Sequence, residues 1–209
     1  MLLAEKVMRC GLDLAGRTRP TVAMLPRGNW IRHYSYDFPA LLAGGIYQLI
    51  EYGLQQFAQA TASAALSVDR FILSAHSGGG MPAVDIIAGA RRPPDEIYVF
   101  DGLYGRDPAT GDPLRGLEVI DDWLRDRLRR EPERESALRV IYIEQQTGPF
   151  SRAVADLVAG QLATIDPAVA VQLSRRYRDE VSRVQHSQIA RYCQPRLLAA
   201  VDTEFNWLE

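Results

Sequence analysis

The 209-residue chain contains little cysteine, little histidine and almost no lysine. Its two cysteines, Cys10 and Cys193, are too few for a disulfide framework and lack the spacing of a metal site. We therefore expect two reduced thiols. We also expect no metal and no cofactor. Arginine supplies all the basic side chains except Lys6, and the formal net charge is only −2. This balance gives no reason to expect a nucleic-acid partner.

Long apolar runs are also missing. No run reaches the roughly 20 residues that a bilayer-spanning helix needs, and the N-terminus lacks the charged and apolar regions of a signal peptide. We therefore expect no membrane span and a cytoplasmic location. The chain is long enough to bury a core, and we expect one domain over residues 1–209.

Strand-like and helix-like patterns alternate along the chain. We expect strands at residues 21–25, 71–75, 96–101, 139–144 and 168–173, and helices at 2–15, 39–66, 81–90, 117–130, 151–163 and 188–201. An aromatic-rich loop covers residues 27–37. Strands that alternate with helices form a parallel sheet with helices on both faces. The predicted fold class is therefore α/β, a three-layer α/β/α sandwich with a mostly parallel sheet.

One stretch carries the clearest chemical signal. A buried strand runs into a serine flanked by small residues, and a helix follows; the stretch reads Ala75-His76-Ser77-Gly78-Gly79-Gly80. At a strand-to-helix turn this pattern is typical of a nucleophile elbow, which exposes the serine hydroxyl. Ala75 and Gly79 are the small neighbours, and Gly78 and Gly80 open the helix with free N–H groups.

This motif resembles that of the α/β-hydrolase superfamily, with alanine where glycine is commoner. The resemblance extends from about residue 20 to the end of the chain. It implies the nucleophile Ser77, followed along the chain by an acid and then by a histidine. A glycine-rich loop after a strand also fits phosphate binding, but Met81 and Pro82 stand where lysine or arginine would be expected.

A serine hydroxyl needs a base, and imidazole titrates near neutrality. His33 precedes the serine, and His76 is adjacent to it, where neighbouring side chains point in different directions. We expect His76 to line the substrate pocket or to bond locally. His186 follows the last predicted strand, and the resemblance places the catalytic histidine there.

Two carboxylates compete to orient the imidazole. Asp101 ends the strand directly after the elbow unit and precedes a glycine, so the chain can turn it toward the edge of the sheet. Glu144 ends the following strand, which is where most members of the superfamily carry the acid. We prefer Asp101, because Glu144 lies beside Gln145 and Gln146 and also fits an ordinary polar strand end.

The oxyanion formed by attack on a carbonyl needs at least two donors. The backbone N–H of Gly78 is one. In the superfamily the second comes from the loop after an earlier strand, which here would fall before Met1. Two accounts fit this count. Either the first strands of the fold are missing and come from another segment or protomer, which we favour, or strand 21–25 and the loop Arg27–Trp30 take their place.

The sequence thus predicts a serine hydrolase that cleaves an ester, thioester or amide through an acyl-Ser77 intermediate. Trp30 and Tyr104, together with His76, are candidates to contact a small-molecule or acyl substrate. The alternative is a non-catalytic binding or partner module that keeps the fold without a complete oxyanion hole. A homo-oligomer or an added N-terminal segment would complete the sheet in either case.

Overall fold

The structure is a computed structural model that describes Leu14 and residues 20–26, 28–31, 35–64, 66–104, 116–130, 135–145 and 147–193. Four short strands form its main sheet, and all neighbouring pairs are parallel in the order β3-β4-β5-β6. Their bounds are Ile72–His76 for β3, Glu96–Phe100 for β4, Ala137–Tyr142 for β5 and Tyr177–Val181 for β6. The α/β class predicted from the sequence is therefore confirmed.

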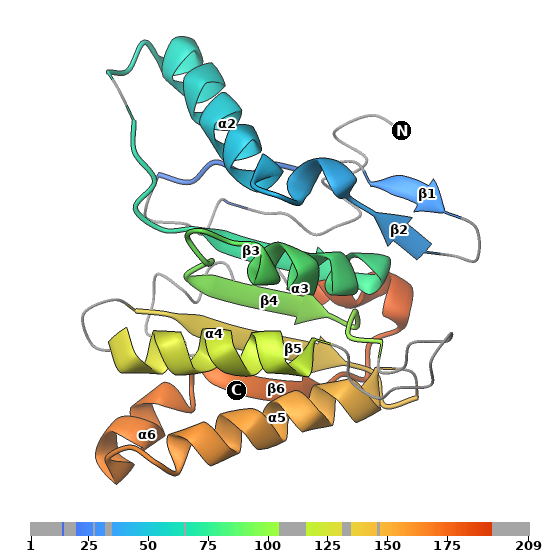
Figure 1. Cartoon of the computed structure of the whole chain (residues 1–209). Helices are drawn as coiled ribbons and strands as arrows, with labels where there is room; N and C mark the ends of the chain where they lie inside the picture. Colours follow the sequence, from blue (N-terminus) through green and yellow to red (C-terminus); the bar gives the residue numbers. More distant parts are fainter. Residues whose placement is uncertain are drawn as a thin grey trace.

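Helices connect these strands. Since neighbours in the sheet are also consecutive in the chain, right-handed crossovers place the connecting helices on one face. Figure 1 shows α3, α4 and α5 side by side in front of the sheet. The bounds are Gly80–Ala88 for α3, Leu117–Arg130 for α4, Gly148–Leu162 for α5 and Pro167–Leu173 for α6. The carboxyl ends of all four strands meet at one edge, where functional groups collect in such sheets.

Apolar side chains pack on both faces of β4 and β5, whose residues are all buried. Under α3, α4 and α5 the core includes Ile97, Val99, Trp123, Val140, Phe150 and Val154. On the opposite face Ile189 and Ala190 pack on Tyr98, Phe100 and Ile141. Burial of each large apolar side chain contributes about 1.5–3 kcal/mol. The last described helical residues, 189–193, are thus fixed against the sheet just after His186.

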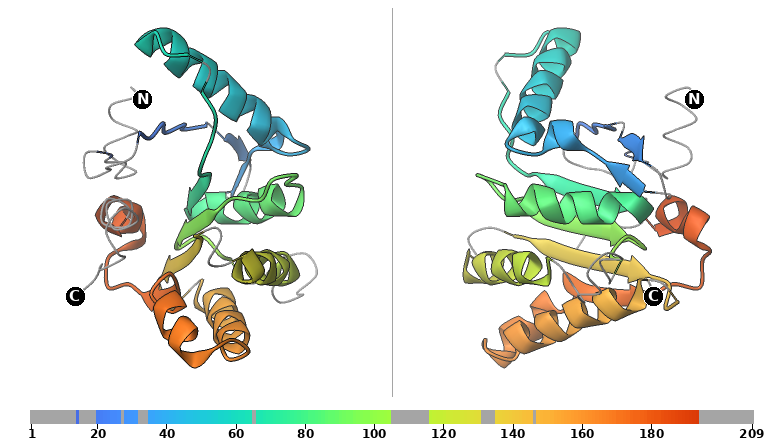
Figure 2. Two further views of the ribbon diagram at one scale, coloured as in Figure 1. Left: turned by 90° about the vertical axis from the view of Figure 1, so that its left-hand side faces the viewer. Right: turned by 45° about the vertical axis from the view of Figure 1, so that its right-hand side comes forward.

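The N-terminal part differs from the prediction. Residues 21–25 form no strand; Met24 packs instead against Gly53 of α2. The aromatic-rich loop contains a short antiparallel hairpin, β1 at Asn29–Ile31 and β2 at Ser35–Asp37. The predicted helix 39–66 divides at Gly44, which has a φ of 90°, into a 3₁₀ turn η1 at Pro39–Leu41 and α2 at Gly45–Thr61. Figure 2 shows α2 extending away from the sheet. The predicted helix 2–15 lies, apart from Leu14, outside the described residues.

The strand predicted at 168–173 is wrong, because these residues belong to helix α6. The Asp166 side chain accepts hydrogen bonds from the N–H groups of Ala168 and Val169, and Pro167 occupies the first turn. Both features favour a helix start over a strand. The strand of this region is β6, in the charged stretch that follows. Among the described residues it lies at the edge of the sheet, where charged side chains reach water.

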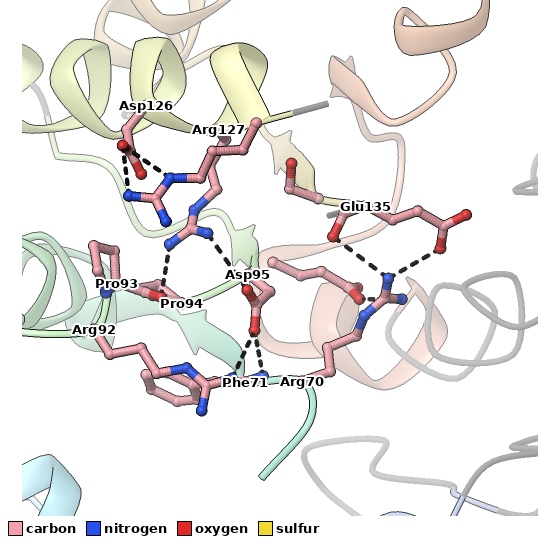
Figure 3. A network of polar contacts seen from close by, with 12 residues as sticks. Arg70, Phe71, Arg92, Pro93, Pro94, Asp95, Asp126, Arg127 and Glu135 are labelled. Carbon is pink, nitrogen blue, oxygen red and sulfur yellow. Dashed lines mark hydrogen bonds and ion pairs between the residues drawn. The ribbon is translucent and has the colours of Figure 1, made fainter. Parts of the chain in front are cut away.

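A buried carboxylate ties the strands together at the opposite, amino edge of the sheet. Asp95 is 1% exposed and accepts a hydrogen bond of 2.8 Å from the N–H of Phe71, just before β3. The Arg127 guanidinium on α4 lies 3.4 Å from the other carboxylate oxygen and also donates to the carbonyl of Pro93. Figure 3 shows Asp95 between these two groups. Asp95 therefore joins the segment before β4 to the start of β3 and to helix α4.

Among the described residues no helix is long and apolar enough to cross a membrane.

Candidate active site

The turn between β3 and α3 places Ser77 at the carboxyl edge of the sheet. A 3₁₀ turn, η2 at Ser77–Gly79, joins the two elements without an intervening loop. Ser77 has a φ of 54°, in the left-handed region that costs an L-residue roughly 1–2 kcal/mol. Strain of this kind persists where the surroundings enforce it, and it is typical of functional turns.

A glycine contact enforces this turn. A Cβ atom on Gly80 would lie 2.0 Å from the carbonyl oxygen of Gly102, so the backbone of α3 touches the segment after β4. Only glycine permits this approach, and it brings Gly102, the residue after Asp101, against the turn that carries Ser77. Gly79 was expected to be small because only small residues fit around the serine at a sharp turn. A Cβ there, however, would meet only the Ala75 Cβ, at an ordinary 3.9 Å.

The His186 imidazole bridges the hydroxyl and the carboxylate. Its Nε2 lies 2.8 Å from Ser77 Oγ, and its Nδ1 lies 2.6 Å from Asp101 Oδ2. A carboxylate oxygen accepts, so Nδ1 carries the proton and Nε2 of the neutral ring accepts from the serine hydroxyl. Residues separated by 109 and 85 positions thus form one hydrogen-bonded chain. We call Ser77, His186 and Asp101 the triad below.

Asp101 is held by residues that sequence reasoning missed. Its Oδ1 accepts from the N–H of Ile143 at 3.0 Å and from the hydroxyl of Thr147, and both donors follow β5. Asp101 is 3% exposed and has a φ of 46°, so its carboxylate is fixed with Oδ2 toward His186. The sequence indicates Thr147-Gly148-Pro149 only as the turn that ends the predicted strand 139–144, and no motif there points to a contact with Asp101.

Glu144 takes no part in this arrangement. It lies on the turn after β5 with about half of its side chain exposed, and it forms an ion pair with Arg152. The geometry therefore favours Asp101 as the carboxylate that orients His186.

His76 bonds to the main chain of His186. Its Nε2 lies 2.8 Å from the backbone carbonyl oxygen of His186, and the two imidazole rings lie 5.0 Å apart. Burial lowers the pKa of His76, and the bond to His186 opposes that effect. A neutral ring that donates from Nε2 holds the main chain of His186, and contact of His76 with a substrate stays a prediction.

Tyr104 lies against the Ser77 hydroxyl. Its hydroxyl is 3.3 Å from Ser77 Oγ, and burial raises the pKa of this phenol. The sequence suggested only that Tyr104 contacts substrate. No pattern of spacing could have placed its hydroxyl against the serine.

The remaining candidates are placed by their backbone alone. Gly78 lies in the first turn after β3, where N–H groups have no partner within the helix. Trp30 lies on β1, and its side chain is outside the described residues, as is His33. Strand β2 lies beside Ser77–Gly79. A small cavity of about 90 Å³ between Pro26 and Leu41 is not lined by any triad residue.

Within the described ranges no group of three or more His, Cys, Asp or Glu side chains could hold a metal ion. The arrangement can instead take a proton from a serine hydroxyl and return it to a leaving group. No protein-family model, curated protein or solved structure significantly matches this chain.

Proposed function

We propose that this protein is a serine hydrolase that cleaves an ester, thioester or amide. One observation carries the proposal: His186 stands between Ser77 Oγ at 2.8 Å and Asp101 Oδ2 at 2.6 Å. Hydrogen-bond contact between nucleophile and base, with a third group orienting the base, is the signature of an activated serine. Neither contact is local in the chain, so folding alone brings the three groups together.

The proposed reaction has two halves. Ser77 Oγ attacks the carbonyl carbon while its proton passes to His186 Nε2, and the carbonyl electron pair moves to the oxygen. The pair then returns, the bond to the leaving group breaks, and His186 protonates that group. Water, activated by the same imidazole, releases the acyl group from Ser77. Asp101 keeps the proton on Nδ1 and stabilises the imidazolium in both halves.

The fold we propose is that of an α/β-hydrolase, with helices in layers on both faces of the sheet. Three observations support it: the left-handed serine at a strand-to-helix turn, the parallel sheet, and the chain order serine, acid, histidine. The acid follows the strand next to the elbow strand, as in some members of the superfamily. The triad chemistry uses no metal or cofactor, and the acyl group and leaving group are left open.

A second candidate function is a non-catalytic binding or partner module. The observation that favours it is the position of β3, which is the edge strand of the main sheet among the described residues. In the superfamily the strand on that side carries the loop with the second oxyanion donor. A second copy of the chain or an added segment would complete such a sheet.

An active-site probe separates the two functions. A fluorophosphonate reacts with an activated serine and should label Ser77, with loss of label in Ser77→Ala and in His186→Ala. Ser74→Ala is a matched control, because Ser74 is an exposed serine on β3 three residues before Ser77. This variant should still be labelled at Ser77 like the wild type. Hydrolysis of short p-nitrophenyl esters should likewise be lost in Ser77→Ala and His186→Ala and retained in Ser74→Ala. Absence of labelling in the folded wild-type protein would refute the hydrolase and favour the binding module.

A further inference from the structure

Tyr104 is the one hydroxyl-bearing side chain, apart from Ser77 itself, that the described residues place at the nucleophile. Its hydroxyl lies 3.3 Å from Ser77 Oγ. The segment that carries it is packed against the core, because Leu103 is fully buried and Gly102 contacts Gly80. The phenol is thus delivered by the same close contact that places Asp101.

The direction of this hydrogen bond follows from the proton count. Ser77 has one hydroxyl hydrogen, and His186 Nε2 accepts it while Nδ1 donates to Asp101. Tyr104 must therefore be the donor toward Ser77 Oγ. Burial raises the pKa of Tyr104, which keeps the phenol protonated and able to donate throughout the neutral range. An apolar pocket wall would need the ring but not a hydroxyl at this point.

A second donor is needed because Gly78 offers a single N–H. The alternative account placed the strand with the other donor at residues 21–25, which form no strand, and β3 has no described strand on its outer side. An oxyanion site needs at least two donors at the atom where negative charge develops. Tyr104 is already directed at the oxygen that will be joined to that carbon.

We propose that the Tyr104 hydroxyl is the second oxyanion donor, acting with the N–H of Gly78, and this inference rests on the proposed hydrolase function. In the resting protein it donates to Ser77 Oγ. When Oγ bonds to the carbonyl carbon, its lone pair is engaged and negative charge appears on the carbonyl oxygen, two bonds away. The hydroxyl rotates to that oxygen without movement of the backbone. As the tetrahedral species collapses, the charge leaves and the hydroxyl returns to Oγ.

The test replaces Tyr104 with phenylalanine, which keeps the ring and removes the donor. We expect kcat/KM for a p-nitrophenyl ester to fall about 10²–10³-fold, the loss typical for one oxyanion donor. Tyr47→Phe is the control, since its hydroxyl bonds to Arg92 far from Ser77, and its activity should match the wild type. Thermal unfolding of both variants should stay close to that of the parent.

A thionoester of the same alcohol supplies the decisive comparison. Sulfur is larger and accepts hydrogen bonds weakly, so an oxyanion site with both donors discriminates against it. The ratio of ester to thionoester kcat/KM should shrink at least 10-fold in Tyr104→Phe, and the ratio does not depend on the folded fraction. An unchanged ratio, or full activity of the variant, overturns this inference and leaves the triad intact. A wild type without Ser77 labelling or activity overturns both proposals.

Discussion

His76 Nε2 lies 2.8 Å from the backbone carbonyl oxygen of His186, so the residue before the proposed nucleophile holds the main chain of the proposed base. In His76→Phe the ring stays and the bond is lost. A neutral hydrogen bond contributes about 0.5–1.5 kcal/mol, so we expect kcat to fall roughly 2- to 10-fold with little change in KM. His76→Gln, whose amide can donate to the same carbonyl, should recover part of the rate. Equal losses in both variants would contradict a positioning role.

The same imidazole makes stability depend on pH. Burial lowers the pKa of His76 in the folded state, whereas the unfolded chain takes up the proton near pH 6.5. The contribution of the neutral ring is therefore complete above about pH 6.5 and is lost as the pH falls toward the folded-state pKa. Between pH 8 and pH 5 the melting temperature of the wild type should fall further than that of His76→Gln. Parallel falls would show that His76 does not drive the change.

Asp101 and Glu144 are the two carboxylates that the sequence offers as the acid, and mutation of each tests the choice. Asp101→Asn keeps the shape but no longer favours the proton on His186 Nδ1, so we expect kcat to fall about 10³–10⁴-fold. Glu144→Gln removes only an exposed ion pair with Arg152 and should keep activity within about twofold. Steady-state kinetics with a p-nitrophenyl ester measures both. The reverse pattern would place the acid after β5 and remove Asp101 from the mechanism.

Adjacent glycines at the elbow should differ sharply. In Gly80→Ala the Cβ would clash with the carbonyl oxygen of Gly102, and overpacking of this kind costs about 1–3 kcal/mol. The shift would also separate Ser77 from Asp101, so labelling of Ser77 should slow strongly. In Gly79→Ala the φ of −82° and the open space suit alanine, and stability should change by less than about 1 kcal/mol. Urea unfolding and the rate of Ser77 labelling should be measured for both variants. If Gly80→Ala and Gly79→Ala lose similar stability and similar labelling rates, the contact between Gly80 and Gly102 does not hold the turn in place.

The sequence predicted those elements whose patterns were strong in themselves. Helix α4 occupies the predicted range 117–130, because its apolar residues repeat at helical spacing and its arginines gather at the end. Strands β4 and β5 are mostly apolar, as buried parallel strands require, although β4 begins at Glu96 and β5 includes Arg139. The strand predicted at 168–173 was wrong because the prediction relied on the apolar residues of this stretch and overlooked Asp166 and Pro167, which start a helix. The strands of the hairpin at 29–37 are only three residues each, too short to show a period.

The candidate site likewise contains some residues that the sequence predicted and others that it did not. Ser77 and its turn follow from local residues, and the meeting of Asp101 with His186 was expected from chain order and from strand ends that share one edge. The groups that hold Asp101 could not be read from the sequence, since the N–H of Ile143 is a backbone group and Thr147 matches no motif. The contact of Tyr104 with Ser77 depends on the packing of Gly80 against Gly102, which only coordinates reveal.

The buried carboxylate Asp95 should be one of the largest single contributors to stability outside the apolar core. Asp95→Asn leaves the Arg127 guanidinium, 3% exposed, without its carboxylate, and turns an acceptor of the Phe71 N–H into an amide that can satisfy only one neighbour. Breaking a buried pair costs about 3–5 kcal/mol, so we expect urea unfolding to shift by that order. Arg130→Gln is the control, because it removes a partly exposed pair with Asp126 worth at most about 0.5 kcal/mol. Since Asp95 joins β3, β4 and α4 at the edge opposite the triad, the remaining folded Asp95→Asn protein should still label at Ser77. A loss of labelling larger than the loss of folded protein would show instead that the register of β3 and β4 is transmitted to Ser77 and Asp101.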